Sequence, residues 1–278
     1  MIETIFVLAV LILLLVFLVR PGSLRPQQEA PFRGRCYAHR GLYEPNGPVP
    51  ENSLAAFRAA AAAGYGIELD VQLTKDGVPV IIHDEAIDRT SNHTGLVRDM
   101  RYEELCQADF AYKWQGTMPF QKIPTLREYF ELVQDKDIIT NIELKTGVFE
   151  YPGIEGKVLA LIEEYGLFDR VVVSSFNHHS VLRIKALAPK LCCGFLSETW
   201  ILDAGAYVSG HGIEAYHPHF AMLTDPEVAD LKAHNVQINT WTVNEAEDIR
   251  HMIAIEADGI ISNWPARVKE ELVKAGLR

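Results

Sequence analysis

The sequence predicts a (β/α)8 TIM barrel with a small insertion, preceded by one N-terminal transmembrane helix. From residue 35 onward, short apolar segments rich in Val and Ile alternate with segments of helical periodicity, as in parallel strands joined by helices. Roughly 250 residues are available for this folded part, a length typical of a closed barrel. Polar side chains also follow successive predicted strands, as expected of a barrel with an active site at one end.

Three regions are expected along the chain: a transmembrane anchor at 1–20, a linker at 21–34 and a catalytic barrel at 35–278. Residues 5–19 read IFVLAVLILLLVFLV, an uninterrupted apolar segment that is shorter than the roughly 20 residues usual for a bilayer span. No Lys or Arg precedes this segment, and no small-residue cleavage site follows it. These features favour a retained anchor over a cleaved signal peptide.

The charges that follow the apolar segment predict its orientation. Arg20, Arg25, Arg33 and Arg35 all lie on its C-terminal side. Because basic residues flank membrane helices mainly on the cytoplasmic side, we expect a single-pass membrane protein with its catalytic domain in the cytoplasm. Residues 21–34 contain several Pro, Gly and Gln residues and are typical of a linker.

The remaining chain contains nine candidate strands for the eight places of a barrel, so one of them is an extra strand. The segments at 80–83 and 215–217 are the two doubtful ones. The strands are expected at 36–39, 67–70, 80–83, 138–143, 171–174, 192–196, 215–217, 237–241 and 259–261. Helices are expected at 53–63, with Asn52 as its N-cap, and at 125–134, 156–165, 179–187, 226–235 and 246–255.

Residues 85–124 form the longest interruption between predicted strands and are expected to be an insertion beside the active-site mouth. Two interpretations of its apolar side chains stay open: they pack the insertion onto the barrel, or they contact lipid. These side chains are Phe110, Tyr112, Trp114, Met118 and Phe120.

Composition argues against several other classes of protein. Hydrophobic residues make up 48% of the chain and charged residues 23%, so a full core is available and disorder is not expected. The net charge is −11 and no Lys/Arg cluster occurs, which argues against a nucleic-acid-binding protein. The spacing of the four cysteines fits neither a zinc site nor a disulfide framework, and we expect buried, reduced thiols. Adjacent Cys192 and Cys193 should face opposite sides of a strand.

Chemically active side chains cluster at the ends of the predicted strands. His39 and Arg40 follow the first strand, and His83 follows the third. Glu68 and Asp70 are two residues apart on the second strand, so their side chains share a face. The fourth strand ends with Glu143 and Lys145, and a later strand ends at Trp241. The carboxyl ends of parallel strands meet at one face of a barrel, where these groups would converge.

Three clustered carboxylates repel each other unless a cation is present. Glu68, Asp70 and Glu143 therefore predict one divalent cation, Mg²⁺ or Ca²⁺, since both prefer oxygen ligands. His39 and His83 are candidates for a general acid and a general base. Arg40 and Lys145 are candidates for binding phosphate.

Several motifs resemble the glycerophosphodiester phosphodiesterase family, whose barrel is similar to that of the phosphatidylinositol phospholipases C. The motifs are AHRG at 38–41, PENSLAAF at 50–57, IELDVQLTKDGVPVIIHDEAIDRTSNHTG at 67–95, NIELK at 141–145, VVVSSF at 171–176, WTVN at 241–244 and DGIISNWP at 258–265. Together they span nearly all of residues 35–265. The long central motif is the most specific of them.

The resemblance implies a metal-dependent hydrolysis of glycerophosphodiesters to sn-glycerol 3-phosphate and an alcohol. It implies His39 and His83 as the acid/base pair, and Glu68, Asp70 and Glu143 as metal ligands. Arg40 and Lys145 then contact the phosphate, and Trp241 forms a wall of the substrate pocket.

Two details are left open. Glu51, in the PEN motif, is either a ligand of the metal or its water, or a cap of the loop after the first strand. The family's last motif usually carries an acidic residue where this chain has Ser262-Asn263, and we expect only a different loop hydrogen bond there.

Two alternatives accompany this hypothesis. A membrane anchor would hold the barrel near a bilayer, where the same site could act as a lysophospholipase D on lysophospholipids. The second alternative is not an enzyme but a non-catalytic barrel that binds phosphodiesters. Against it, residues of the expected type fill all the candidate positions.

Overall fold

A computed structural model describes residues 35–43, 45 and 47–277. The predicted anchor and linker lie outside these described residues. Within them, no helix has the length and apolar character needed to cross a membrane.

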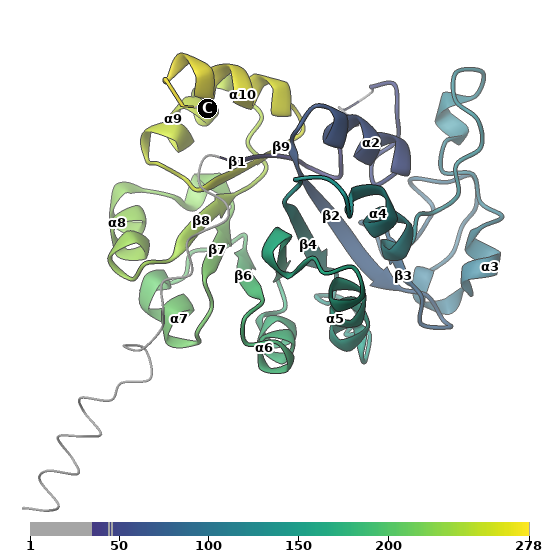
Figure 1. Ribbon diagram of the computed structural model, residues 1–278, viewed down its shortest axis with the longest axis horizontal. Coiled ribbons are helices and arrows are strands. Elements are labelled where there is room, and N and C mark those ends of the chain that lie inside the picture. Colours follow the sequence, from purple (N-terminus) through teal and green to yellow (C-terminus); the bar gives the residue numbers. More distant parts are fainter. Residues whose placement is uncertain (1–34, 44, 46, 278) are drawn as a thin grey trace, which may run out of the picture. The chain divides into compact units, whose positions relative to one another are not determined.

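Eight parallel strands close into a barrel, as the sequence predicted, because β1 pairs with both β2 and β9. The barrel strands are β1 Arg35–Ala38, β2 Gly66–Leu73, β4 Thr140–Leu144, β5 Val171–Ser175, β6 Cys192–Ser197, β7 Ala215–Pro218, β8 Gln237–Thr240 and β9 Gly259–Ser262. Helices surround the strands (Figure 1). They are α2 Leu54–Ala62, α4 Leu126–Val133, α5 Ile154–Glu164, α6 His178–Leu187, α7 Ala204–Gly210, α8 Asp225–Ala233, α9 Ala246–Ala254 and α10 Pro265–Lys274.

The extra strand is β3, Pro79–Ile81, which runs antiparallel to β2. The sequence interpretation that put His83 at the end of a parallel barrel strand is therefore wrong, and 215–217 belongs to barrel strand β7. Only residues 74–78 separate β2 from β3, and so short a connection permits a hairpin but not a parallel crossover.

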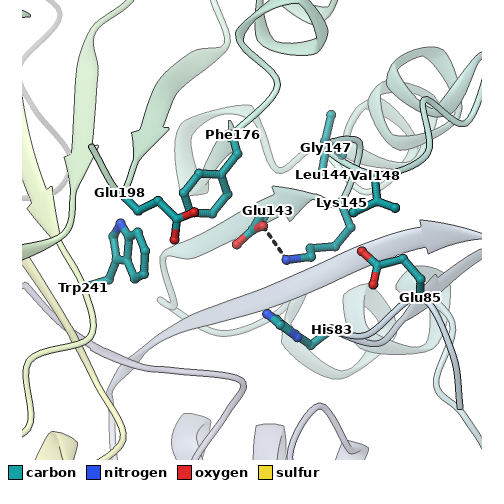
Figure 2. Close-up of a pocket in the computed structure, with 10 residues that line it drawn as sticks. All are labelled: His83, Glu85, Glu143, Leu144, Lys145, Gly147, Val148, Phe176, Glu198 and Trp241. Carbon is teal, nitrogen blue, oxygen red and sulfur yellow. Dashed lines mark hydrogen bonds and ion pairs between the residues drawn. The ribbon is translucent and has the colours of Figure 1, made fainter. Parts of the chain in front are cut away.

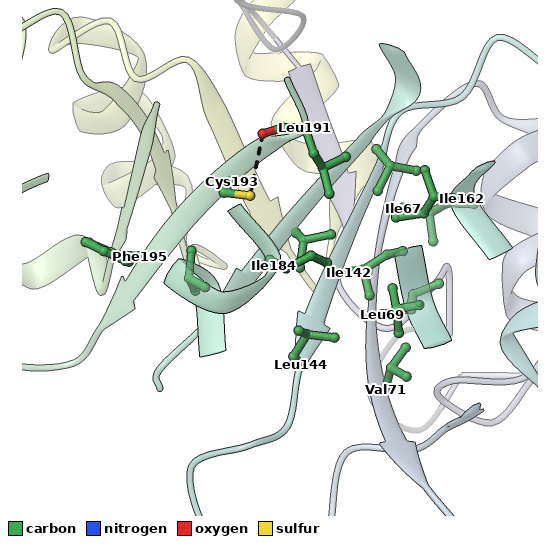
Figure 3. Packing of buried hydrophobic residues seen from close by; sticks show 14 of the residues in the cluster. Ile67, Leu69, Val71, Ile142, Leu144, Ile162, Ile184, Leu191, Cys193 and Phe195 are labelled. Atoms are coloured by element: carbon green, nitrogen blue, oxygen red, sulfur yellow. Dashed lines mark hydrogen bonds between the residues drawn. The ribbon is translucent and has the colours of Figure 1, made fainter. Parts of the chain in front are cut away.

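Successive side chains along each barrel strand point alternately toward the surrounding helices and into the barrel. Ile67, Leu69 and Val71 of β2 belong to the core cluster that lies between the strands and the helices (Figure 3). Glu68 and Asp70, on the opposite face, therefore point into the barrel. Nearer the N-terminal ends of the strands, the barrel interior is filled by a separate apolar cluster of Tyr37, Ile139, Val172, Cys192 and Ile261.

The prediction of buried cysteines is confirmed for Cys192 and Cys193, whereas Cys36 and Cys106 are only partly buried. Cys192 lies in the cluster inside the barrel, and Cys193 lies in the outer core. All four thiols are free. Burial raises the pKa of the Cys193 thiol to about 12, so it stays protonated near neutral pH.

The insertion at 85–124 forms a satellite beside β3. It contains α3, Tyr102–Leu105, and short 3₁₀ turns at Val97–Asp99 and Tyr112–Trp114. Its apolar side chains form a separate cluster with Val80 and Ile82, and Phe110 is buried in it. The indole of Trp114 donates a 2.8 Å hydrogen bond to the carbonyl of Gly47, which ties the insertion to the loop after β1. Most of the insertion therefore packs on the protein, although Phe120 is 54% exposed.

Candidate active site

The three predicted metal ligands lie together at the carboxyl ends of β2 and β4. Asp70 and Glu143 are register partners on adjacent strands, and Glu68 precedes Asp70 by two residues on the same face. One oxygen from each of the three carboxylates lies within 4.8 Å of the others. The side chains of Glu68, Asp70 and Glu143 are 5%, 1% and 12% exposed, so this charge cluster is largely shielded from water.

Burial raises the pKa of Glu68 well above its usual range, and the charges of Asp70 and Glu143 raise it further. Burial likewise raises the pKa of Glu143, against the opposing charge of Lys145. Burial also acts to raise the pKa of Asp70, but His83, Lys145 and Arg40 outweigh it and lower the pKa to about 2. The cluster thus has a deficit of positive charge, and its donors are all oxygens. This arrangement fits a hard divalent cation.

Two cations flank Asp70. Lys145 Nζ lies 2.9 Å from Glu143 Oε1 and 3.9 Å from Asp70 Oδ1. Arg40 Nε lies 3.6 Å from Asp70 Oδ2, and its backbone amide donates a 2.8 Å hydrogen bond to Glu68. Both predicted phosphate-binding residues therefore lie beside the carboxylate cluster.

The AHRG motif shapes the turn that presents Arg40. Arg40 and Gly41 both have positive φ angles, 55° and 81°. A Cβ on Gly41 would lie 2.9 Å from the Cβ of Ala56 in α2, so only glycine lets the turn pack this closely on that helix.

Three residues of the PENS segment, Glu51, Asn52 and Ser53, make different contacts. Ser53, not Asn52 as predicted, caps α2, because its hydroxyl accepts the amide of Ala56 at 3.1 Å. Asn52 instead donates a 2.8 Å hydrogen bond to Asp70 Oδ2. Glu51 lies outside the carboxylate cluster and pairs with Arg40 at 2.9 Å and with Arg89 at 2.7 Å. Burial acts to raise the pKa of Glu51, but hydrogen bonds from Arg89 and the charge of Arg40 outweigh it and lower the pKa.

Each histidine has a partner on Nδ1. His39 Nδ1 lies 2.6 Å from Asn263 Oδ1, and its Nε2 lies 3.9 Å from Glu68. Burial, helped by the charge of Arg40, lowers the pKa of His39 to about 4. His83 Nδ1 lies 2.7 Å from Asp84 Oδ1. The hydrogen bond from His83 holds the pKa of Asp84 well below its usual range.

The interaction of His39 corrects one expectation. Asn263 occupies the position where the family usually has an acidic residue, and only a different loop hydrogen bond was expected there. Asn263 instead binds the ring of His39, a candidate catalytic residue. Tyr43 also donates to Asn263 Oδ1, at 3.2 Å.

The carboxylate cluster opens into a cavity of about 330 Å³. Figure 2 shows Glu143, Lys145 and His83 on one side of it, and Trp241, Phe176 and Glu198 on another. Trp241 thus lines the cavity, and its ring meets that of Phe176 edge-on at 5.4 Å. The indole nitrogen of Trp241 donates to the carbonyl of His217 at 2.8 Å, which holds the ring in place.

The profile of the glycerophosphoryl diester phosphodiesterase family matches residues 39–267, a segment that contains every residue of this site. The chain belongs to the glycerophosphoryl diester phosphodiesterase family. By that membership it is a phosphodiesterase.

Relatives named as glycerophosphodiester phosphodiesterases match most of the chain. A glycerophosphodiester phosphodiesterase from Caldanaerobacter subterraneus subsp. tengcongensis is 42% identical over 86% of this chain and 98% of its own length. The enzyme of the same name from Bacillus altitudinis is 40% identical over 86% of this chain and 99% of its own length. Among solved structures, an Oleispira antarctica phosphodiesterase in complex with the product sn-glycerol-3-phosphate superposes with a TM-score of 0.79 and 27% identity. It covers 87% of this chain and 98% of its own.

Four residues of this phosphodiesterase site were not singled out as functional from the sequence. Asn52 binds Asp70, and Arg89 binds both Glu51 and Asp84. Asn263 binds His39. The fourth, Gln72, donates to the carbonyls of residues 82, 83 and 84 at 3.1, 3.0 and 2.7 Å. The alternation of β2 could have indicated Gln72, since it shares a face with Glu68 and Asp70.

Proposed function

We propose that this chain hydrolyses glycerophosphodiesters to sn-glycerol 3-phosphate and an alcohol, with one divalent cation and two histidines. The observation that carries the proposal is the three-carboxylate cluster, in which Arg40 and Lys145 flank Asp70 and His39 lies 3.9 Å from Glu68. The Oleispira antarctica relative, whose structure contains sn-glycerol-3-phosphate, supports the choice of substrate.

Glu68, Asp70 and Glu143 would hold the cation, either Mg²⁺ or Ca²⁺. When bound, a cation at this cluster supplies Lewis-acid stabilisation of the negative charge that grows on the phosphoryl oxygens. Arg40 and Lys145, on either side of Asp70, bind and orient the phosphate through charge-assisted hydrogen bonds. Trp241 and Phe176 border the cavity and exclude water from one side of the substrate.

The partners of the two histidines support different roles. Asn263 Oδ1 only accepts hydrogen bonds, so His39 carries its proton on Nδ1 and leaves the lone pair of Nε2 free. Because its pKa is lowered to about 4, the ring of His39 is uncharged near neutral pH, and its Nε2 takes the proton of the nucleophile, either water or a neighbouring glycerol hydroxyl. Asp84 Oδ1 holds Nδ1 of His83 at 2.7 Å and so orients the ring, and His83 gives its Nε2 proton to the leaving alkoxide.

The test is turnover of glycerophosphocholine by the full chain with Mg²⁺ or Ca²⁺. Glycerol 3-phosphate is detected with a coupled dehydrogenase, and choline and phosphocholine are detected separately to identify the bond that breaks. We expect equal amounts of glycerol 3-phosphate and choline, lost on addition of EDTA and recovered with excess metal. Release of phosphocholine, or full turnover in EDTA, would contradict the proposal.

Exposed apolar residues around the mouth favour lysophospholipids as a second substrate class. Val148, Phe176, Trp200 and Leu202 follow β4, β5 and β6 and are 66%, 37%, 53% and 91% exposed. Two of them, Val148 and Phe176, line the cavity itself. An acyl chain carried by the glycerol would gain apolar contacts here. If this site acts as a lysophospholipase D, lysophosphatidylcholine is turned over at a kcat/KM at least equal to that for glycerophosphocholine. A much lower value would restrict the chain to deacylated substrates.

We further propose that residues 5–19 anchor the chain in a membrane, with the barrel on the cytoplasmic side. The fifteen apolar residues and the four arginines after them support this topology. Carbonate-washed membranes should retain the full chain, and protease added to intact cells should not cleave the barrel. Release by carbonate, or cleavage from outside, would contradict the anchor or its orientation respectively.

A further inference from the structure

One guanidinium group connects two carboxylates at the edge of the site. Arg89, in the loop after β3, donates to Asp84 from Nε at 2.6 Å and from Nη2 at 3.1 Å. It donates to Glu51 from Nη1 at 2.8 Å and from Nη2 at 2.7 Å. Each carboxylate therefore receives a two-pronged contact, the strongest geometry that arginine and carboxylate form.

Each of these carboxylates also forms a hydrogen bond with a residue of the proposed mechanism. Asp84 Oδ1 binds the Nδ1 atom of His83 at 2.7 Å. Glu51 Oε1 binds Arg40 Nη1 at 2.9 Å. His83, Asp84, Arg89, Glu51 and Arg40 thus form one continuous chain of hydrogen bonds. It joins the loop after β1 to the segment after β3, which approach each other only in the folded barrel.

We propose that Arg89 is a positioning residue that orients His83 through Asp84 and Arg40 through Glu51. The hydrogen bonds that its guanidinium makes within the described residues all go to Asp84 and Glu51, so it acts through these two carboxylates. Its side chain is 46% exposed, and packing alone does not hold it. The four hydrogen bonds do, together with a 2.8 Å contact from Lys113 Nζ to its backbone carbonyl.

The shared guanidinium also prevents a charge conflict. Without Arg89, the carboxylates of Asp84 and Glu51 would lose the cation between them and repel each other. Glu51 would keep only Arg40, and Asp84 would be free to rotate away from His83. Lysine cannot replace this contact, because a single ammonium lacks the planar set of donors that grips two carboxylates at once.

The proposal rests on the two-histidine function above. The same experiment tests the positioning role of Arg89 and the acid/base role of His83. Arg89→Ala, Arg89→Lys and His83→Ala are compared with the full chain on glycerophosphocholine. We expect Arg89→Ala to lower kcat/KM by about 10²-fold, with kcat reduced through His83 and KM raised through Arg40. Arg89→Lys should recover little of this loss, whereas added guanidinium ion should restore part of the activity of Arg89→Ala.

A double-mutant cycle tests the route of the effect. Because Arg89 acts on His83 through Asp84, Asp84→Asn should add little to the kcat loss of Arg89→Ala. The matched control is Arg127→Ala, since Arg127 is similarly exposed and makes a two-pronged contact with Glu164, and neither residue belongs to the carboxylate cluster or lines the cavity. The control should leave kcat and KM unchanged.

Two results would overturn the positioning role. One is a kcat/KM of Arg89→Ala within twofold of the unaltered chain. The other is full recovery by Arg89→Lys, which would show that any positive charge suffices. If Arg89→Ala lowers thermal stability, the guanidinium rescue and the Arg89→Lys kinetics still decide, because both are measured on folded protein. Full activity of His83→Ala would instead contradict the two-histidine function and leave the geometry of Arg89 without a catalytic purpose.

Discussion

The backbone amide of Ile82 donates a 3.0 Å hydrogen bond to the carbonyl oxygen of Asp70. This contact places the residue after Ile82, which is His83, beside the carboxylate cluster although β3 is not a barrel strand. A hairpin that folds back along β2 therefore delivers the second histidine to the site.

Gln72 is expected to hold this hairpin in place. It is fully buried, donates to three carbonyls of the 82–84 segment, and accepts a 2.6 Å hydrogen bond from Tyr151. Gln72→Met keeps the volume but leaves these polar groups unpaired, which should cost about 1–3 kcal/mol of stability in denaturant unfolding and reduce kcat. Gln134→Met, at an exposed position, is the control and should change neither quantity. An unchanged kcat in folded Gln72→Met would show that catalysis does not depend on these hydrogen bonds to the hairpin.

Replacement of either histidine should abolish most turnover. His39→Ala and His83→Ala are each expected to reduce kcat by about 10²-fold or more, the usual contribution of a positioned acid or base. His251→Ala, on the exposed side of α9, serves as the control. Steady-state kinetics at saturating metal make the comparison. Near-normal kcat in both variants would exclude the acid/base assignment.

The neutral partner of His39 predicts a specific pH effect. Burial and Arg40 lower the pKa of His39 to about 4, so the ring is neutral and able to act as a base above that pH. Asn263→Asp places a carboxylate 2.6 Å from Nδ1 in the same geometry and favours the protonated ring. The acid limb of the kcat/KM profile should then move to higher pH. A limb that stays in place or moves to lower pH would show that His39 is not the base.

Metal binding should weaken as the pH falls. The raised pKa of Glu68 means that protons compete with the cation for this carboxylate over the range below that pKa. Isothermal titration of the EDTA-treated chain with Mg²⁺ or Ca²⁺ should show tighter binding at higher pH. At lower pH, where Glu68 is protonated, binding should be weaker and should release protons. Glu68→Gln should remove most of the affinity, and Glu247→Gln, on exposed α9, should not. Affinity independent of pH would argue against Glu68 as a ligand.

The sequence indicated the helix α2 and most of the strands because their signals are local. It did not indicate α7 and α10. The first, with the sequence AGAYVSG, has two glycines and no clear amphipathic pattern. The second did carry a usable signal, since proline at its start precedes an alternation of apolar and charged residues.

By itself, the sequence determined the barrel and the shared face of Glu68 and Asp70, because a repeat of two along a strand requires no knowledge of the rest of the chain. Only the tertiary structure decided which groups meet across long separations. Asn263 is 224 residues from His39, and Arg89 is 38 residues from Glu51. Such pairs leave no periodic trace in the sequence, since each forms only when the closed sheet brings the loops after different strands to one face.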